Sequence, residues 1–153
     1  MANLLLVAHC PSPNTEALRD AFLRGAAAGG EAAVTSRALA PLDADAADVE
    51  WADLVTIGTT ENFGYMAGRV KDFFERIYYP CLERTEGLPW ALYVRAGTDG
   101  TGTIASVERI VTGLRWRAVQ PPELFRGDFD DGFLERCETL GAGLAAGLAA
   151  GIF

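Results

Sequence analysis

Positive charge is scarce in this sequence. Its 153 residues include 13 Lys and Arg against 21 Asp and Glu, a formal net charge of −8, and Lys71 is the only lysine. Nucleic-acid binding needs a basic face that neutralises phosphates, and a polybasic membrane patch needs clustered cations. The scattered basic residues therefore argue against both nucleic acid and a membrane surface as partners.

Paired cysteines and long apolar runs are also missing. Cys10, Cys81 and Cys137 lie far apart and form no C-x-x-C pair, which predicts reduced thiols in a cytoplasmic protein. The run Leu4–Ala8 is too short for a signal peptide. The Gly- and Ala-rich tail Gly141–Phe153 falls short of the ~20 apolar residues that a membrane span needs. We expect a cytoplasmic protein without a membrane segment.

The common phosphate and metal signatures are absent. No G-x-x-x-x-G-K-[ST] occurs, which excludes a P-loop nucleotidase, and no G-x-G-x-x-G follows the first apolar run, which disfavours an ordinary dinucleotide-binding Rossmann domain. Gly58, rather than an aspartate, follows the apolar run at 54–57. A magnesium-dependent phospho-acceptor domain needs acids there to ligate its metal, and we expect no metal site.

Strand-like and helix-like patterns alternate along the whole chain. With 50% hydrophobic and 22% charged residues and no linker, the sequence predicts one domain over residues 1–153. Apolar runs predict strands, and apolar residues at helical spacing predict helices. Strands are expected at Asn3–Ala8, Ala32–Leu39, Leu54–Gly58, Leu88–Arg95 and Arg117–Val119. Helices are expected at Thr15–Gly29, Asp43–Trp51, Gly68–Tyr79, 104–114 and 133–148.

A β-α unit repeated about five times favours a parallel sheet covered on both faces. We therefore predict a three-layer α/β/α sandwich with a five-stranded parallel sheet of order 2-1-3-4-5. Ligands of such sheets bind beyond the carboxyl ends of the strands, where the strand order reverses. That point lies between the first and third strands, so the loops His9–Thr15 and Thr59–Gly68 are expected to face each other.

The first of these loops runs straight into a helix. Ser12 and Thr15 offer hydroxyls, Asn14 an amide, and the helix start offers unpaired N–H groups, so the junction can hold a phosphate without any lysine. Pro11 and Pro13 restrict the loop. Helix capping by Asn14 or Thr15 explains part of the same pattern, and the residues alone leave both interpretations open.

The second loop combines aromatic side chains with glycines. Phe63 and Tyr65 can pack on a planar ring, and Gly64 and Gly68 let main chain approach its rim. The alternative is a surface loop that only covers the end of the sheet.

Three stretches carry a resemblance to a known family. The central one, TTENFGYMAGRVKDFFERIYYPCLE from Thr59 to Glu83, resembles the flavin loop and following helix of the flavodoxin-like NAD(P)H-dependent FMN reductase family. Leu4–Thr15 is similar to that family's first strand and FMN-phosphate loop, and VRAGTDGTG at Val94–Gly102 to its third flavin loop. Relatives often carry proline where Thr60 stands.

The resemblance implies a flavodoxin-like fold and an FMN site made by three loops. The first loop would take the phosphate, the second would border the isoalloxazine, and the third would close the other side. The residues implied in cofactor binding are His9, Ser12, Pro13, Asn14, Thr15, Thr59, Thr60, Glu61, Asn62, Phe63, Gly64, Tyr65, Ala96, Gly97, Thr98 and Asp99.

The resemblance also implies an oxidoreductase. NADPH or NADH would pass hydride to FMN, and the reduced flavin would serve a quinone, a flavin or a similar acceptor; no catalytic acid or nucleophile is required. A flavodoxin-type electron carrier, docking to redox proteins, is the alternative, and a scaffold that has lost its cofactor is a third. A homodimer is expected from the resemblance, with Trp116, Phe125 and Phe129 either at its interface or in the core.

Overall fold

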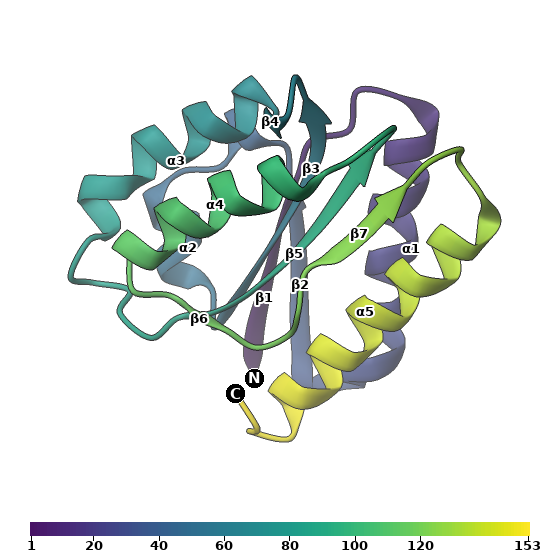
Figure 1. Ribbon diagram of the computed structural model, residues 1–153. Helices are drawn as coiled ribbons and strands as arrows, with labels where there is room; N and C mark the ends of the chain where they lie inside the picture. Colours follow the sequence, from purple (N-terminus) through teal and green to yellow (C-terminus); the bar gives the residue numbers. More distant parts are fainter.

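A sheet runs through the centre of the protein with helices on both faces (Figure 1). The computed structural model describes all 153 residues. Its main path of paired strands is parallel and follows the order β2 (Val34–Leu39), β1 (Ala2–Ala8), β3 (Leu54–Asn62), β5 (Pro89–Ala96) and β6 (Arg117–Ala118). Because β1 lies between β2 and β3, the strand order reverses beside β1, as the sequence predicted.

The sheet nevertheless has seven strands, so the prediction of five purely parallel strands in the order 2-1-3-4-5 is wrong. β4 (Tyr65–Met66) is antiparallel to the end of β3, and β7 (Glu123–Arg126) pairs with the second half of β5. The edge beside β5 is divided between β6 and β7 because Pro121 and Pro122, which lie between them, have no N–H to donate to the ladder.

Alternate residues of the central strands enter two separate cores. In β1, Leu5 and Val7 pack in one core, and Leu4 and Leu6 pack in the other; all four are fully buried. Side chains of a strand alternate between the two faces of the sheet, so a continuous apolar run supplies apolar side chains to both cores. This is why the N-terminal run forms a central strand.

Two helices cover one face of the sheet and three cover the other (Figure 1). α1 (Pro13–Gly30) and α5 (Asp131–Ala149) lie on the face of Leu4, and α2 (Ala46–Trp51), α3 (Gly68–Cys81) and α4 (Thr101–Gly113) on the face of Leu5. The predicted three-layer α/β/α arrangement is confirmed. None of the helices combines the length and apolar character needed to cross a membrane.

Several boundaries differ from the sequence prediction for local reasons. Short 3-10 helices, η1 (Glu31–Ala33) and η2 (Pro41–Asp43), flank β2, which therefore begins at Val34 rather than Ala32. The acidic helix begins only at Ala46, where the Asp45 carboxylate caps it. α3 continues through Pro80 to Cys81, because a proline in the last turn removes only one helical hydrogen bond.

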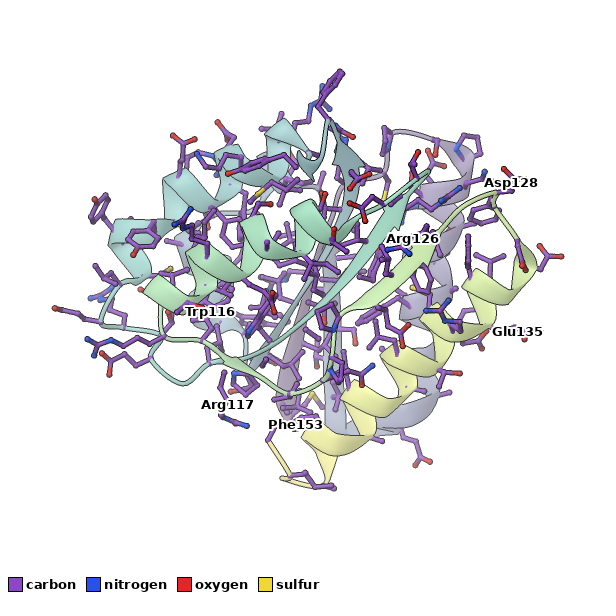
Figure 2. All side chains as sticks on the ribbon, in the orientation of Figure 1. Trp116, Arg117, Arg126, Asp128, Glu135 and Phe153 are labelled. Atoms are coloured by element: carbon purple, nitrogen blue, oxygen red, sulfur yellow. The ribbon has the colours of Figure 1, made fainter.

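Two of the aromatic side chains considered for an interface belong to the core. Trp116 and Phe125 are buried, and the Trp116 indole N–H donates to the Thr85 hydroxyl over 2.8 Å (Figure 2). Phe129 is half-buried and contacts the Phe133 ring edge-on, with 5.8 Å between ring centres. An interface through Trp116 or Phe125 is therefore ruled out by burial.

Candidate functional site

Three loops meet beyond the carboxyl ends of β1, β3 and β5. The first is joined to β3 by a hydrogen bond from His9 N–H to the Gly58 carbonyl (2.9 Å). The second and third are joined by a hydrogen bond from Gly100 N–H to the Glu61 carboxylate. The structure thus brings together the three stretches that sequence reasoning selected, and Glu61 is the side chain that connects two of them.

The hydroxyls of the first loop are engaged in capping α1. Ser12 is the N-cap residue: its Oγ accepts from Thr15 N–H (3.3 Å), while Thr15 Oγ1 accepts from Ser12 N–H (3.0 Å) and donates to the Ser12 carbonyl (2.8 Å). This reciprocal pair is a capping box. The sequence suggested Asn14 or Thr15 as the capping residue. The structure instead places Ser12 at the N-cap, and the buried Thr15 supports it.

Some donors of this loop stay free. The N–H groups of Cys10 and Asn14 and the exposed Asn14 side chain form no hydrogen bond. Pro11 and Pro13 contribute none, since proline lacks an N–H. The positive end of the α1 dipole lies at the same place. The loop thus retains a small set of anion donors centred on Asn14.

The segment Thr59–Gly68, expected to be a loop, consists largely of the end of β3 and a hairpin. β3 continues through Asn62, and Thr59 is buried, where its Oγ1 accepts from Ala67 N–H (3.1 Å). Thr60 Oγ1 donates to Asn62 Oδ1 (2.9 Å). The Thr59 and Thr60 hydroxyls therefore stabilise the hairpin, and contact with a ligand is left to the residues at the hairpin tip.

The hairpin tip presents an aromatic side chain to solvent. Phe63 and Gly64 both have positive φ, 54° and 72°, as a type I′ hairpin turn requires. Phe63 is fully exposed and Tyr65 is partly exposed. Because a phenylalanine seldom occupies the left-handed region, this backbone outlier favours a functional use of the exposed ring.

The third loop, Gly97–Gly100, is held at both ends and open in the middle. Arg126, labelled in Figure 2, donates from β7 through Nε to the Asp99 carbonyl (2.7 Å), and the Asp99 carboxylate accepts from the Thr101 hydroxyl (2.9 Å). The N–H groups of Gly97, Thr98 and Asp99 make no hydrogen bond. Three neighbouring main-chain donors therefore remain available beside the hairpin.

Sequence reasoning missed one buried polar atom near this loop. Thr103, in the first turn of α4, is completely buried and its hydroxyl has no hydrogen-bond partner. A buried hydroxyl without a partner is uncommon and often marks a position completed by a ligand or by water. The only indication of this residue in the sequence was the position of Thr103, three residues after Gly100, the N-cap residue of α4.

The titratable groups of the first loop are uncharged at neutral pH. Burial, and secondly the Arg69 guanidinium, lower the pKa of His9 below its ordinary value. Burial raises the pKa of the Cys10 thiol, with opposing effects from Arg19 and the nearby acids. A neutral His9 supplies one donor and one acceptor, and a protonated Cys10 is a poor nucleophile.

Comparison with known proteins identifies the fold. No family model and no curated protein matches the sequence. Among solved structures, a flavodoxin from the domain Archaea has 16% identity and a TM-score of 0.81, over 97% of this chain and 99% of that one. A WrbA-like flavodoxin protein from Agrobacterium tumefaciens has 18% identity and a TM-score of 0.76, over 98% of each chain.

The flavodoxin of Megasphaera elsdenii, in its two-electron reduced form, is similar as well, with 16% identity, a TM-score of 0.76, and coverage of 93% of this chain and 98% of that one. The class of protein is therefore defined at the level of architecture: the chain has a flavodoxin-like fold, as the resemblance implied. At these identities the likeness concerns the fold, and the function rests on the site.

Proposed function

We propose that this protein binds FMN between the three loops and acts as an NAD(P)H-dependent oxidoreductase that serves a quinone, a flavin or a similar acceptor. The observation that carries the proposal is the meeting of the Asn14 donors, the exposed hairpin tip and the free N–H groups of the third loop at the point where the strand order reverses. The solved structures of similar fold include proteins named as flavodoxins, which supports the choice of ligand.

The donor set suits a phosphorylated flavin. Asn14 and the start of α1 would hold the phosphate, with Ser12 and Thr15 supporting them through the capping box. The N–H groups of Gly97, Thr98 and Asp99 suit the polar edge of a flavin, and Phe63 and Tyr65 offer aromatic surface to its faces. His9, Pro13, Thr59 to Asn62, Gly64 and Ala96 would line or support the same crevice.

The flavin, when bound, supplies the hydride and electron chemistry, and the protein binds and orients it. The Glu61 carboxylate holds the hairpin to the third loop, which fixes the spacing between the two groups that would flank the ring. Arg126 keeps the third loop in place from its other side. No side chain of the site is required as an acid, a base or a nucleophile, and we assign no catalytic residue.

The proposal is tested by the absorbance spectrum of the purified protein mixed with FMN, followed by anaerobic addition of NADPH or NADH. We expect saturable spectral changes at a stoichiometry of one, and then rapid bleaching of the flavin band. Free FMN with the same nicotinamide is the control for uncatalysed reduction. A spectrum identical to that of free FMN would remove the proposed function and leave the fold standing.

A flavodoxin-type electron carrier is a second candidate, and the net charge of −8 favours it, because an acidic surface suits docking to basic redox proteins. The carrier is distinguished by flavin that dithionite bleaches but NADPH and NADH do not. We prefer the reductase, because the 61–65 segment resembles the reductase loop.

A further inference from the structure

A cavity of about 350 Å³ lies where β1 and β2 end, and His9, Cys10 and Pro11 of the first loop form part of its lining. Its walls also come from Leu39 at the end of β2 and Leu42 in the segment that follows, and from two arginines, Arg19 of α1 and Arg69 of α3. Because β1 separates β2 from β3, this cavity lies beside the β2–β1 pair, whereas the hairpin of the second loop extends from β3 at the same edge of the sheet.

One of the two arginines, Arg69, gives the cavity a positive charge that no ion pair neutralises. Arg69 makes no ion pair and no hydrogen bond, although Lys71 on the same helix pairs with Glu75 over 2.9 Å. Arg19 uses its Nε for Asp20 (3.0 Å) and leaves its two terminal amino groups free. Asp43 is the single acid of the lining. In a chain of net charge −8, the unpaired Arg69 guanidinium and the free terminal amino groups of Arg19 in the same cavity point to an anionic ligand.

Apart from His9, the remaining lining is mostly apolar. Leu39 at the end of β2 and Leu42 in the following segment form one side, and Leu42 is 53% exposed although it is a large aliphatic side chain. An inorganic anion gains nothing from such a wall, whereas a base beside a phosphate uses both halves of the cavity. A volume of about 350 Å³ also falls in the range of sites for small organic ligands, roughly 300 to 1,000 Å³.

We propose that this cavity binds the phosphate monoester of a nucleotide, with the base against Leu39 and Leu42 and the phosphate between Arg19 and Arg69. If the protein is the proposed NAD(P)H-dependent oxidoreductase, this nucleotide is the 2′-phosphorylated adenosine end of NADPH. The choice of NADPH as the ligand therefore rests on the proposed function. The cavity lies two strand spacings, roughly 10 Å, from the gap beside β5, a separation that a dinucleotide can span while its nicotinamide reaches the flavin.

Arginine is suited to this ligand because its planar fork binds phosphate oxygens in pairs. NADH lacks the 2′-phosphate, so the two guanidinium groups would select NADPH. Arg69 and Arg19 are thus assigned as residues that determine the choice of electron donor, distinct from the residues that hold the flavin.

The test uses calorimetric titration of the whole protein with adenosine 2′,5′-bisphosphate, with and without saturating FMN. We expect one site in both conditions and at least tenfold weaker binding in Arg69→Gln and in Arg19→Gln, with FMN affinity unchanged. Arg109→Gln is the matched control, because Arg109 is an exposed helical arginine of α4 without an ion pair and lies outside the cavity. It should bind the bisphosphate like the parent.

The outcomes separate the site from the function. Absence of bisphosphate binding, competition by FMN, or an equal loss in Arg109→Gln would overturn the inference. Inorganic phosphate binding as tightly as the bisphosphate would overturn the nucleotide assignment. If FMN fails to bind while the bisphosphate binds with the expected arginine dependence, the cavity stands and the proposed function falls. In an active enzyme, Arg69→Gln should raise KM for NADPH at least tenfold and leave KM for NADH within about twofold.

Discussion

At the scale of single residues, the structure of the first loop separates helix capping from anion binding, two roles that the sequence alone could not separate. Ser12 and Thr15 satisfy each other in the capping box, so their side chains are already explained by the helix start. Asn14, at the second helical position, has no such explanation, since neither its N–H nor its amide is bonded. A change at Asn14 should therefore affect anion binding far more than folding.

Replacing Asn14 by aspartate tests this separation. A carboxylate in the first turn interacts favourably with the helix dipole, by about 0.3–1 kcal/mol, but repels the FMN phosphate. We expect the FMN dissociation constant, measured by quenching of flavin fluorescence, to rise at least tenfold, while the free energy of unfolding in urea stays equal or increases slightly. Asn14→Ala, which adds no charge, should lose less affinity. Equal FMN affinity in Asn14→Asp and the parent would mean that the loop only caps the helix.

The buried thiols give the stability of the protein an alkaline limit. Burial, and secondarily the Glu123 carboxylate, raise the pKa of Cys137 to about 12, and burial raises that of Cys81 to about 11. A thiol in an unfolded chain titrates near 8.5. Above that pH the unfolded chain releases protons that the folded chain retains, so stability is complete below about pH 8.5 and is lost as the pH rises toward 11 or 12.

The slope of this loss is about 1.4 kcal/mol per pH unit for one thiol proton. Burial also raises the pKa of Tyr93, which adds to the loss above its ordinary titration range. Urea unfolding in the presence of a reductant, at several pH values above 8, measures the slope, and Cys137→Ala should reduce it. A stability that is constant over this range would show that the thiols reach solvent in the folded state.

At the scale of secondary-structure elements, close main-chain approach decides how helices and loops meet. α1 and α5 touch at Gly25 and Gly141, where a Cβ would overlap the main chain of the opposite helix. The start of α4 touches the hairpin in the same way, because a Cβ at Gly102 would overlap the Gly64 carbonyl oxygen. The spacing between the second and third loops therefore depends on Gly102, in the first turn of α4.

Gly102→Ala should separate the hairpin from α4. We expect the free energy of unfolding to fall by about 1–3 kcal/mol, the usual cost of overpacking, and FMN affinity to fall at least fivefold because the two loops no longer flank the ring correctly. Gly143→Ala is the matched control in α5, where a Cβ meets no atom within 4 Å and the substitution should stabilise the helix by about 0.5–1 kcal/mol. If FMN affinity in Gly102→Ala equals that of Gly143→Ala, the loop spacing does not control binding.

At the scale of the whole molecule, a ligand held by three loops from three strands should stabilise the fold as a unit. FMN at a hundredfold excess over its dissociation constant should add about 2.7 kcal/mol to the free energy of unfolding. In a domain of this size, that corresponds to a rise of about 5–10 °C in Tm. Riboflavin, which lacks the phosphate, should produce a smaller rise at the same concentration. No rise with FMN would contradict flavin binding without affecting the fold.

Much of the architecture was accessible from local patterns. The run at Leu4–Ala8 could only be a strand buried on two faces, and helical spacing identified the helices of both layers. The boundaries failed where contacts distant in sequence act. Thr59 and Thr60 pair with Val94 and Arg95 of β5, which extends β3 past the glycine that was expected to end it.

The same distinction between local patterns and distant contacts applies to the candidate site. Local chemistry selected the first two loops, because turn residues, hydroxyls and amides cluster there, and the family resemblance implied the third. The Glu61 carboxylate on Gly100 N–H, the unpartnered Thr103 hydroxyl and the cavity of Arg19 and Arg69 were not accessible, since each joins residues that are far apart in the chain or depends on what surrounds them.

Apolar periodicity, turn chemistry and charge content are properties of neighbouring residues, and they were sufficient to predict the layered α/β class, the acidic character and the first two candidate loops. The division of the edge strand into β6 and β7, the burial of Trp116 and Phe125, and the grouping of Arg19 and Arg69 beside β1 arise only when distant segments pack. Burial and pairing are relations between such segments, and a one-dimensional pattern does not contain them.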